Sequence, residues 1–194
     1  MITESQRAEV VRVARSFIGT PYHHMGRVKG AGVDCATLLA EVYYEAGVLK
    51  EPVAIEYYPM DWHLHRDDER YLQMVQRYCR EIPAERVAPG DIVIYHFGRA
   101  WSHGGIVIDV RRPGEHVASA DPREQSARAQ QRSVAEPLQI TIVHALVNQN
   151  VQLADGERDG VLVGRKRRCF SPVVGGQSRA VESRRSARKG AKRQ

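Results

Sequence analysis

The spacing of apolar residues changes once along this chain, near residue 89, and that change restricts the folds that the chain can adopt. Before it, apolar residues recur at helical spacing in three segments, and we expect helices at about 4–18, 35–46 and 66–80. After it, short runs of strand-forming residues are separated by turn residues. Helices followed by consecutive strands are typical of an α+β domain with an antiparallel sheet.

Local signals support these elements. Thr3 and Gln6 have the spacing of a capping box, and Asp34 is a natural N-cap for the second helix. Cys79 falls on the buried side of the third predicted helix, where it is explained as a small core residue. A weak hairpin is expected around residues 155 and 156, and strands are predicted at 91–97, 104–110, 116–120, 133–138 and 139–147.

The length of 194 residues suits one domain followed by a tail. We assign residues 1–150 to the folded domain and residues 151–194 to a weakly structured extension. Residues 165–194 contain 11 of the 29 Lys and Arg residues and a single acidic residue, Glu182. Two interpretations of this basic tail stay open: a solvated, disordered end, and an electrostatic contact with nucleic acid or another polyanion.

Other features exclude several classes of protein. Three cysteines without a pattern argue against a disulfide scaffold and favour synthesis in a reducing compartment. No apolar run is long enough to span a membrane, and no secretory signal is visible, so we expect synthesis in the cytoplasm. No metal or other cofactor is expected, because adjacent histidines rarely bind one metal and no set of His, Cys and Asp residues has ligand-like spacing. The histidines considered are His23, His24, His63 and His65.

Cys35 is the strongest candidate for a reactive residue. It follows a glycine-rich run and Asp34, which places it in the first turn of a helix, where main-chain N–H groups and the helix dipole stabilise a thiolate. His103 precedes an apolar strand far downstream. A cysteine at a helix start and a histidine on a strand can form the catalytic pair of a thiol hydrolase. The competing interpretation is a buried structural cysteine and a turn histidine.

A catalytic imidazole needs a third group that fixes its orientation. His116 is our first choice, because a hairpin would bring it across from the strand of His103; Ser119 and His144 are the alternatives. A surface histidine at the start of a strand is the competing interpretation of His116. Tyr22 is expected beside the second helix, where its phenol either donates a hydrogen bond to an oxyanion or packs under a loop.

Three parts of the sequence together resemble the NlpC/p60 family of cell-wall cysteine peptidases. The order and spacing of these motifs agree across about residues 5–147. They are Gly19-Thr20-Pro21-Tyr22 with the later run Gly30-Ala31-Gly32-Val33-Asp34-Cys35, then Pro89-Gly90-Asp91-Ile92-Val93, and Ser102-His103-Gly104-Gly105-Ile106-Val107. The resemblance implies a papain-like α+β fold and cleavage of peptidoglycan stem peptides, often next to γ-D-glutamyl and diaminopimelate residues.

The resemblance also assigns roles. It makes Cys35 the nucleophile, His103 the base and Tyr22 an active-site tyrosine, and Asp34 matches an acidic residue that helps hold the amino end of the substrate in relatives. One departure is Ala36, where relatives usually have serine or a similar small polar residue. A second is the segment 117–119, in which alanine can fall on the usual position of the third catalytic residue.

Within the family, the chain most resembles the branch encoded by phages and gene transfer agents, whose peptidases act at the tail tip or during tail assembly. This implies peptidoglycan peptides as substrate, tail-tip proteins as partners and the virion tail as a location. Two alternatives stay open. The domain is a structural tail component that has lost catalysis, or it performs acyl transfer or another amidase reaction on a substrate outside the cell wall.

Overall fold

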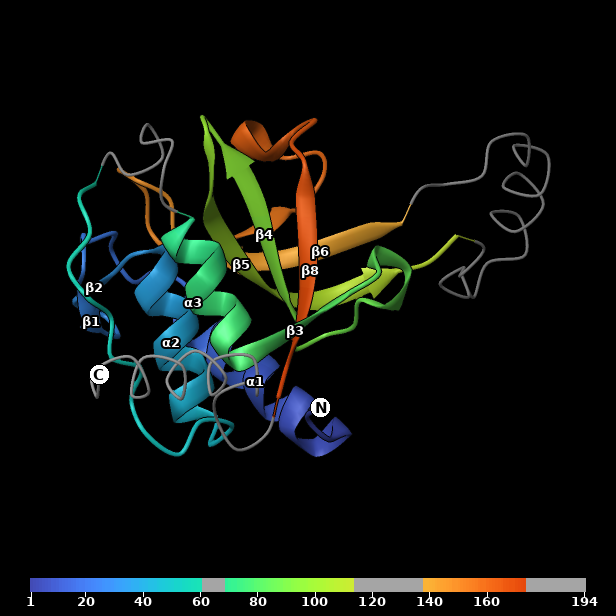
Figure 1. Ribbon diagram of the computed structural model, residues 1–194, viewed down its shortest axis with the longest axis horizontal. Helices are drawn as coiled ribbons and strands as arrows, with labels where there is room; N and C mark the ends of the chain where they lie inside the picture. The colour runs from blue at the N-terminus through green and yellow to red at the C-terminus, as the bar shows by residue number, and fades with distance from the viewer. Residues whose placement is uncertain (61–68, 114–137, 174–194) are drawn as a thin grey trace, which may run out of the picture.

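The computed structural model describes residues 1–60, 69–113 and 138–173, and it confirms the predicted α+β class (Figure 1). Its helices are α1 (Glu4–Ser16), α2 (Cys35–Glu45) and α3 (Arg70–Tyr78), with short 3-10 turns η2 (Ala84–Arg86) and η3 (Gly160–Leu162). Its strands are β1 (Arg27–Val28), β2 (Gly32–Val33), β3 (Cys79–Ile82), β4 (Ile92–Phe97), β5 (Ala100–Arg111), β6 (Gln139–His144), β7 (Gln152–Asp155) and β8 (Arg167–Pro172).

One six-stranded sheet organises the domain. Its strand order is β3-β8-β4-β5-β6-β7, and every neighbouring pair is antiparallel. Strands β1 and β2 form a separate two-stranded ribbon that leads into α2. The long central strand β5 contacts all three helices, so it connects the helical layer to the sheet.

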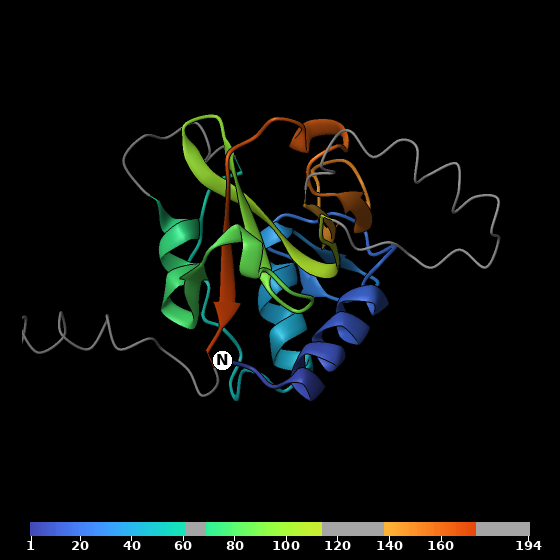
Figure 2. The ribbon, with the colours of Figure 1, turned by 90° about the vertical axis from the view of Figure 1, so that its right-hand side faces the viewer.

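The sheet separates two apolar clusters. Ile92 and Ile94 of β4 pack with α1, α2 and α3 on one face, whereas Val93 and Tyr95 point to the other face, where Leu162 of η3 covers them. Figure 1 shows α1, α2 and α3 together at the lower left of the sheet, and Figure 2, turned by 90°, shows β8 in front with the green helix α3 to its left and the blue helix α1 to its lower right. This alternation follows from the two-residue repeat of a strand. Packing of the helices on this face therefore places the start of α2 beside β5.

The structure corrects the predicted domain boundary. β7 pairs with β6, and β8 lies inside the sheet between β3 and β4, so residues 151–173 belong to the folded domain rather than to an extension. Their short, polar strands carry little periodic signal, and only their neighbours in the sheet make them regular. Residues 174–194, most of the predicted basic tail, lie outside the described residues.

Part of the predicted tail is therefore structured. Arg168 in β8 makes a bidentate ion pair with Glu81 of β3, with 2.7 Å between Nε and Oε1, and Arg167 pairs with Glu157. The guanidinium of Arg165 stacks on Phe97, 3.7 Å from the ring centroid. These arginines are used within the fold, which weakens the prediction that they contact a polyanion.

Several element boundaries differ from the predictions. α1 ends at Ser16 rather than near residue 18, and α3 ends at Tyr78. Cys79 is buried, as expected, but it begins strand β3, because pairing with β8 outweighs the local helical pattern. The predicted strands at 116–120 and 133–138 lie outside the described residues.

Candidate functional site

The start of α2 is built as the sequence predicts. Asp34 has extended backbone dihedral angles and caps the helix: its Oδ1 accepts hydrogen bonds from the main-chain N–H groups of Ala36 and Thr37, at 3.1 and 2.9 Å. The Thr37 hydroxyl accepts from the N–H of Asp34 in return, which completes a capping box. Cys35 is thereby fixed as the first residue of the helix.

The second carboxylate oxygen of Asp34 is also occupied by internal donors. Oδ2 accepts from the N–H of Met25, at 2.7 Å, and from the hydroxyl of Tyr58. Nδ1 of His24 lies 3.5 Å from the same oxygen. We call Asp34, His24, Met25 and Tyr58 the carboxylate cluster. The hydrogen bonds of Oδ1 confirm the N-cap role of Asp34, whose residue is only 1% exposed. Its role in holding the substrate stays a prediction.

Cys35 is half-buried, and its surroundings oppose a thiolate more than they favour one. The main-chain N–H groups of Gly104 and Cys35 lower the pKa of the thiol, as expected for a helix start. Burial, and then the negative charge of Asp34, outweigh them and raise the pKa well above its usual value. Desolvation therefore exceeds the effect of the helix terminus and raises the pKa of this thiol, whereas the sequence predicts a lowered pKa.

His103 reaches the site through an irregularity in the sheet. The β4–β5 register shifts between Tyr95 and His96, and His103 pairs with Tyr95 immediately before the shift. The His103 ring lies 5.1 Å from the Phe97 ring, centroid to centroid. Such a bulge reorients side chains at a strand end. It brings Ser102 O within 3.8 Å of the Cys35 sulfur.

His144 is the histidine that contacts His103. Nε2 of His103 and Nδ1 of His144 are 2.9 Å apart, and β5–β6 pairing sets this geometry by placing His144 opposite Gly105. We call the two side chains the imidazole pair. His144 was an alternative choice for the orienting group; His116 and Ser119 lie outside the described residues, and their roles stay predictions.

Burial keeps the imidazole pair uncharged. It lowers the pKa of His103 to about 3, with further contributions from His144 and Arg165, and it lowers the pKa of His144 to about 4. Nε2 of His103 is engaged with His144, so Nδ1 is the nitrogen left for a thiol or a substrate. Among the described residues, the Cys35 sulfur and the His103 ring are not hydrogen-bonded to each other.

Cys35 and His103 nevertheless share one cleft. It encloses about 130 Å³ and is partly open to solvent. Tyr22 also lines it, as predicted, and burial, followed by the charges of Cys35 and Asp34, raises the pKa of this phenol, so Tyr22 is neutral and can donate a hydrogen bond. The remaining lining residues are Met60, Phe97, Ser102, Ala145, Leu146 and Val147.

Sequence reasoning missed three side chains around Cys35, namely Tyr71, Tyr58 and His24. The hydroxyl of Tyr71 donates to the main-chain oxygen of Cys35 at 3.3 Å and lies where a side chain on Gly104 would be, 2.2 Å from the position of its Cβ. Gly104 is therefore needed for this close approach. No local signal identifies Tyr71, since its helical spacing only indicates burial, and the paired histidines were considered only as metal ligands.

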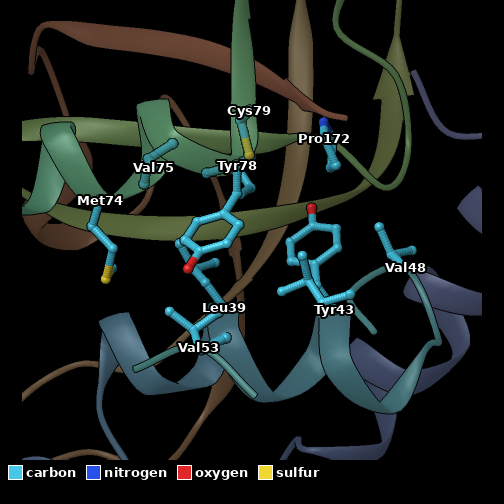
Figure 3. Close-up of a pocket in the computed structure, with 12 residues that line it drawn as sticks. Leu39, Tyr43, Val48, Val53, Met74, Val75, Tyr78, Cys79 and Pro172 are labelled. Atoms are coloured by element: carbon cyan, nitrogen blue, oxygen red, sulfur yellow. The ribbon is translucent and has the colours of Figure 1, made fainter. Parts of the chain in front are cut away.

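A second pocket lies farther along α2, away from Cys35, and its lining is almost wholly apolar. Figure 3 shows Leu39, Tyr43, Val75 and Cys79 around it, together with Pro172 at the end of β8. It encloses about 40 Å³ and its surface is almost wholly apolar. It does not include Cys35. We interpret it as a packing defect between α2 and α3, apart from the candidate site.

The described residues also bear on metal binding and on membrane spanning. No group of three His, Cys, Asp or Glu side chains in residues 1–60, 69–113 and 138–173 is arranged to hold a metal ion. Within the same ranges, no helix is both long and apolar enough to cross a bilayer. His63 and His65 lie outside these ranges.

The model of the NlpC/P60 family matches residues 19–136. The crystal structure of the NlpC/p60 domain of the peptidoglycan hydrolase SagA is 15% identical, with a TM-score of 0.49, over 85% of this chain and 97% of that chain. Among curated proteins, none matches the chain significantly.

Proposed function

Because the family model matches residues 19–136, more than half of the chain, the protein belongs to the NlpC/P60 family, and we propose on this basis that it is a thiol hydrolase. Its substrates would be the amide bonds in peptidoglycan stem peptides. The observation that carries the proposal is the single cleft lined by both Cys35 and His103, with His144 bonded to the far nitrogen of His103. Nucleophile, base and orienting group are the three parts that such a reaction requires.

The proposed reaction uses Nδ1 of His103 as the base. When Nε2 of His103 carries its proton and donates to Nδ1 of His144, Nδ1 of His103 has a free lone pair. It takes the thiol proton as the Cys35 sulfur attacks the amide carbon, and it then gives this proton to the leaving amine. Water hydrolyses the resulting thioester with the same histidine as base.

The oxyanion of the tetrahedral intermediate needs hydrogen-bond donors that are already in place. The N–H of Cys35 and the phenol of Tyr22 are the candidates, and the N–H of Gly104, which interacts with the sulfur in the resting site, is a third. All three lie beside the nucleophile. Their stabilisation acts on the transition state and so lowers the barrier for attack rather than strengthening substrate binding.

Substitution of the nucleophile tests the proposal. Cys35→Ala should abolish cleavage of purified muropeptides and leave the circular dichroism spectrum unchanged, because the change removes only the sulfur atom. Cys169→Ala is the matched control, since Cys169 is buried on the other side of the sheet and should retain cleavage. Equal cleavage by Cys35→Ala and the wild type would overturn the assignment.

A structural component without catalysis is the second candidate. The raised pKa of Cys35, the missing thiol–imidazole hydrogen bond and the alanine at position 36 favour it. Alkylation separates the two. A catalytic Cys35 should be shielded from iodoacetamide while a muropeptide occupies it or forms a thioester with it, whereas a purely structural cysteine should be alkylated at the same rate with and without the muropeptide.

We also propose that the enzyme acts in a phage-like tail, with tail-tip proteins as partners. The support is the segment Ser133-Val134-Ala135-Glu136-Pro137-Leu138, which resembles the sequence that follows the third catalytic position in that branch of the family. Mass spectrometry of purified particles tests this location, and its absence from every particle would contradict it.

A further inference from the structure

His24 has no role assigned so far, although it lies beside Asp34, the residue that precedes the nucleophile. Its side chain is 19% exposed, and of its two ring nitrogens only Nε2 is hydrogen-bonded, whereas Nδ1 is buried without a hydrogen-bond partner among the described residues. Nε2 is 2.8 Å from the main-chain oxygen of Tyr58, and Nδ1 is 3.5 Å from Oδ2 of Asp34. The ring packs edge-on against the Tyr58 ring, with centroids 5.0 Å apart at 85°.

These contacts restrict the protonation state of the ring. A carbonyl oxygen only accepts hydrogen bonds, so Nε2 of His24 must carry a proton. In a neutral ring Nδ1 would then have a lone pair facing the lone pairs of the Asp34 carboxylate, and both would be buried. An imidazolium removes this repulsion, because its Nδ1–H points at the carboxylate and the charges are opposite.

We propose that the imidazolium form of His24 pairs with Asp34 and thereby controls how readily Cys35 loses its proton. The inference rests on the proposed function only in taking Cys35 as the nucleophile. His24 acts through Asp34 and is a positioning residue: it neutralises the one carboxylate of the cluster, whose negative charge otherwise opposes a thiolate on the next residue.

The other titratable groups around this pair do not supply the charge. Burial raises the pKa of each surrounding tyrosine, so these phenols are neutral. The titratable side chains around His24 and Asp34 come from each neighbouring element. They are Tyr22 and His23 from the loop of His24, Cys35 from α2, Tyr58 from the segment before residue 60, Tyr71 from α3, and His103 from β5 across the cleft. Among these described groups, only His24 lies beside Asp34 with a positive charge to offer.

Loss of the proton from His24 leaves the charge of Asp34 uncompensated. The pKa of the Cys35 thiol is then higher than it is when His24 is protonated. Rising pH therefore has two opposing effects on the thiol: it favours ionisation directly and opposes it through the loss of the His24 charge. The short link from His24 through Asp34 to Cys35 therefore gives the nucleophile a dependence on pH that the neutral imidazole pair does not provide.

The test compares two neighbouring histidines. His24→Gln keeps an N–H donor for the oxygen of Tyr58 and removes the charge. His23→Gln is the matched control, because His23 is exposed and its ring nitrogen Nδ1 lies 3.1 Å from the main-chain oxygen of His24 rather than beside Asp34. Alkylation of Cys35 by iodoacetamide is followed from pH 5 to 10 by mass spectrometry of the Cys35 peptide. Circular dichroism shows whether each variant folds.

We expect Cys35 to be alkylated about tenfold more slowly in His24→Gln than in the wild type where His24 is protonated, and the two profiles to converge at high pH, where it is neutral. His23→Gln should overlay the wild type. Overlapping profiles for His24→Gln and the wild type, or equal shifts for both variants, would overturn the inference. The assay uses no muropeptide, so it stands even if peptidoglycan cleavage is not observed.

A second measurement does not depend on a variant. NMR of the 15N-labelled wild type should show a proton on both ring nitrogens of His24 at pH 6. As the pH rises and His24 loses one of these protons, the alkylation rate of Cys35 should increase less steeply than the roughly tenfold per pH unit expected of an isolated thiol. A bare Nδ1 at pH 6 would contradict the pairing with Asp34.

Discussion

Two buried polar clusters flank Cys35, and they handle burial in opposite ways. The imidazole pair consists of two side chains that are 5% and 2% exposed and that lose their charge, because burial lowers the pKa of His103 to about 3 and of His144 to about 4. The carboxylate cluster is equally buried at Asp34, but it surrounds this side chain with donors from the main chain, Tyr58 and His24.

The difference between the two clusters indicates which of their side chains can gain or lose a proton during a reaction. A buried charge persists only where hydrogen bonds or an opposite charge replace water. The carboxylate cluster provides these, so its charge is part of the fold. The imidazole pair has one internal hydrogen bond, and Nε2 of His144 has no partner among the described residues. A neutral base with a free nitrogen is suited to accept the thiol proton of Cys35.

The largest effects should come from breaking the imidazole pair. His103→Ala should reduce kcat/KM for muropeptide cleavage by about 10²–10⁴-fold, because it removes the general base. His144→Ala should reduce it less, by about 10–100-fold, since His103 remains but loses the contact that orients it. Steady-state kinetics on one purified muropeptide measure both.

His116→Ala extends this experiment to the residue that the sequence favoured. If His144 orients His103, His116→Ala should keep the activity of the wild type. A loss of activity in His116→Ala that equals or exceeds the loss in His144→Ala would return the orienting role to His116.

The next largest effect should come from the carboxylate cluster. Asp34→Ala removes a helix cap and leaves buried donors without an acceptor, and should lower the free energy of unfolding by about 3 kcal/mol. Thr3→Ala removes the equivalent cap of α1 at an exposed position and should cost only about 1 kcal/mol. Chemical denaturation measures both, and equal losses would show that burial adds nothing to the Asp34 cap.

A smaller effect should separate the clusters by pH. An imidazole whose pKa is lowered by folding binds protons more readily in the unfolded chain, so the free energy of unfolding falls as pH drops below about 6.5. At pH 5 each member of the imidazole pair should contribute a loss of about 2 kcal/mol relative to pH 7. Denaturation at pH 5 and pH 7 measures this loss.

The double variant His103→Gln with His144→Gln is the control for this dependence. It should show a flatter change in stability between pH 7 and pH 5 than the wild type. Identical changes in the two proteins would mean that the imidazole pair is not the source of the acid sensitivity.

Much of the site was predictable where it depends on near neighbours in the chain. The capping box at Asp34 and the position of Cys35 follow from residues within one helical turn. The partner of His103 did not follow, because it depends on the β5–β6 register across a separation of 41 residues. Pattern reasoning favoured His116, since a short hairpin is the nearest way to bring a second histidine back.

The C-terminal part of the fold shows the same limit. β8 was assigned to a weakly structured extension, because its arginines resemble a solvated tail. In the sheet, Arg168 pairs with Glu81 and Arg165 stacks on Phe97, so their charges have partners that are far away in sequence. Composition alone cannot distinguish a solvated basic run from one that is paired across strands.

The sequence by itself determined the order of helices and strands, the start of α2 and the choice of Cys35 and His103, because these rest on local hydrogen bonding and on residue type. Tertiary structure alone decided the protonation of the thiol, the partner of the imidazole and the place of β8. The physical reason is that desolvation and cross-strand pairing arise only when distant segments pack together.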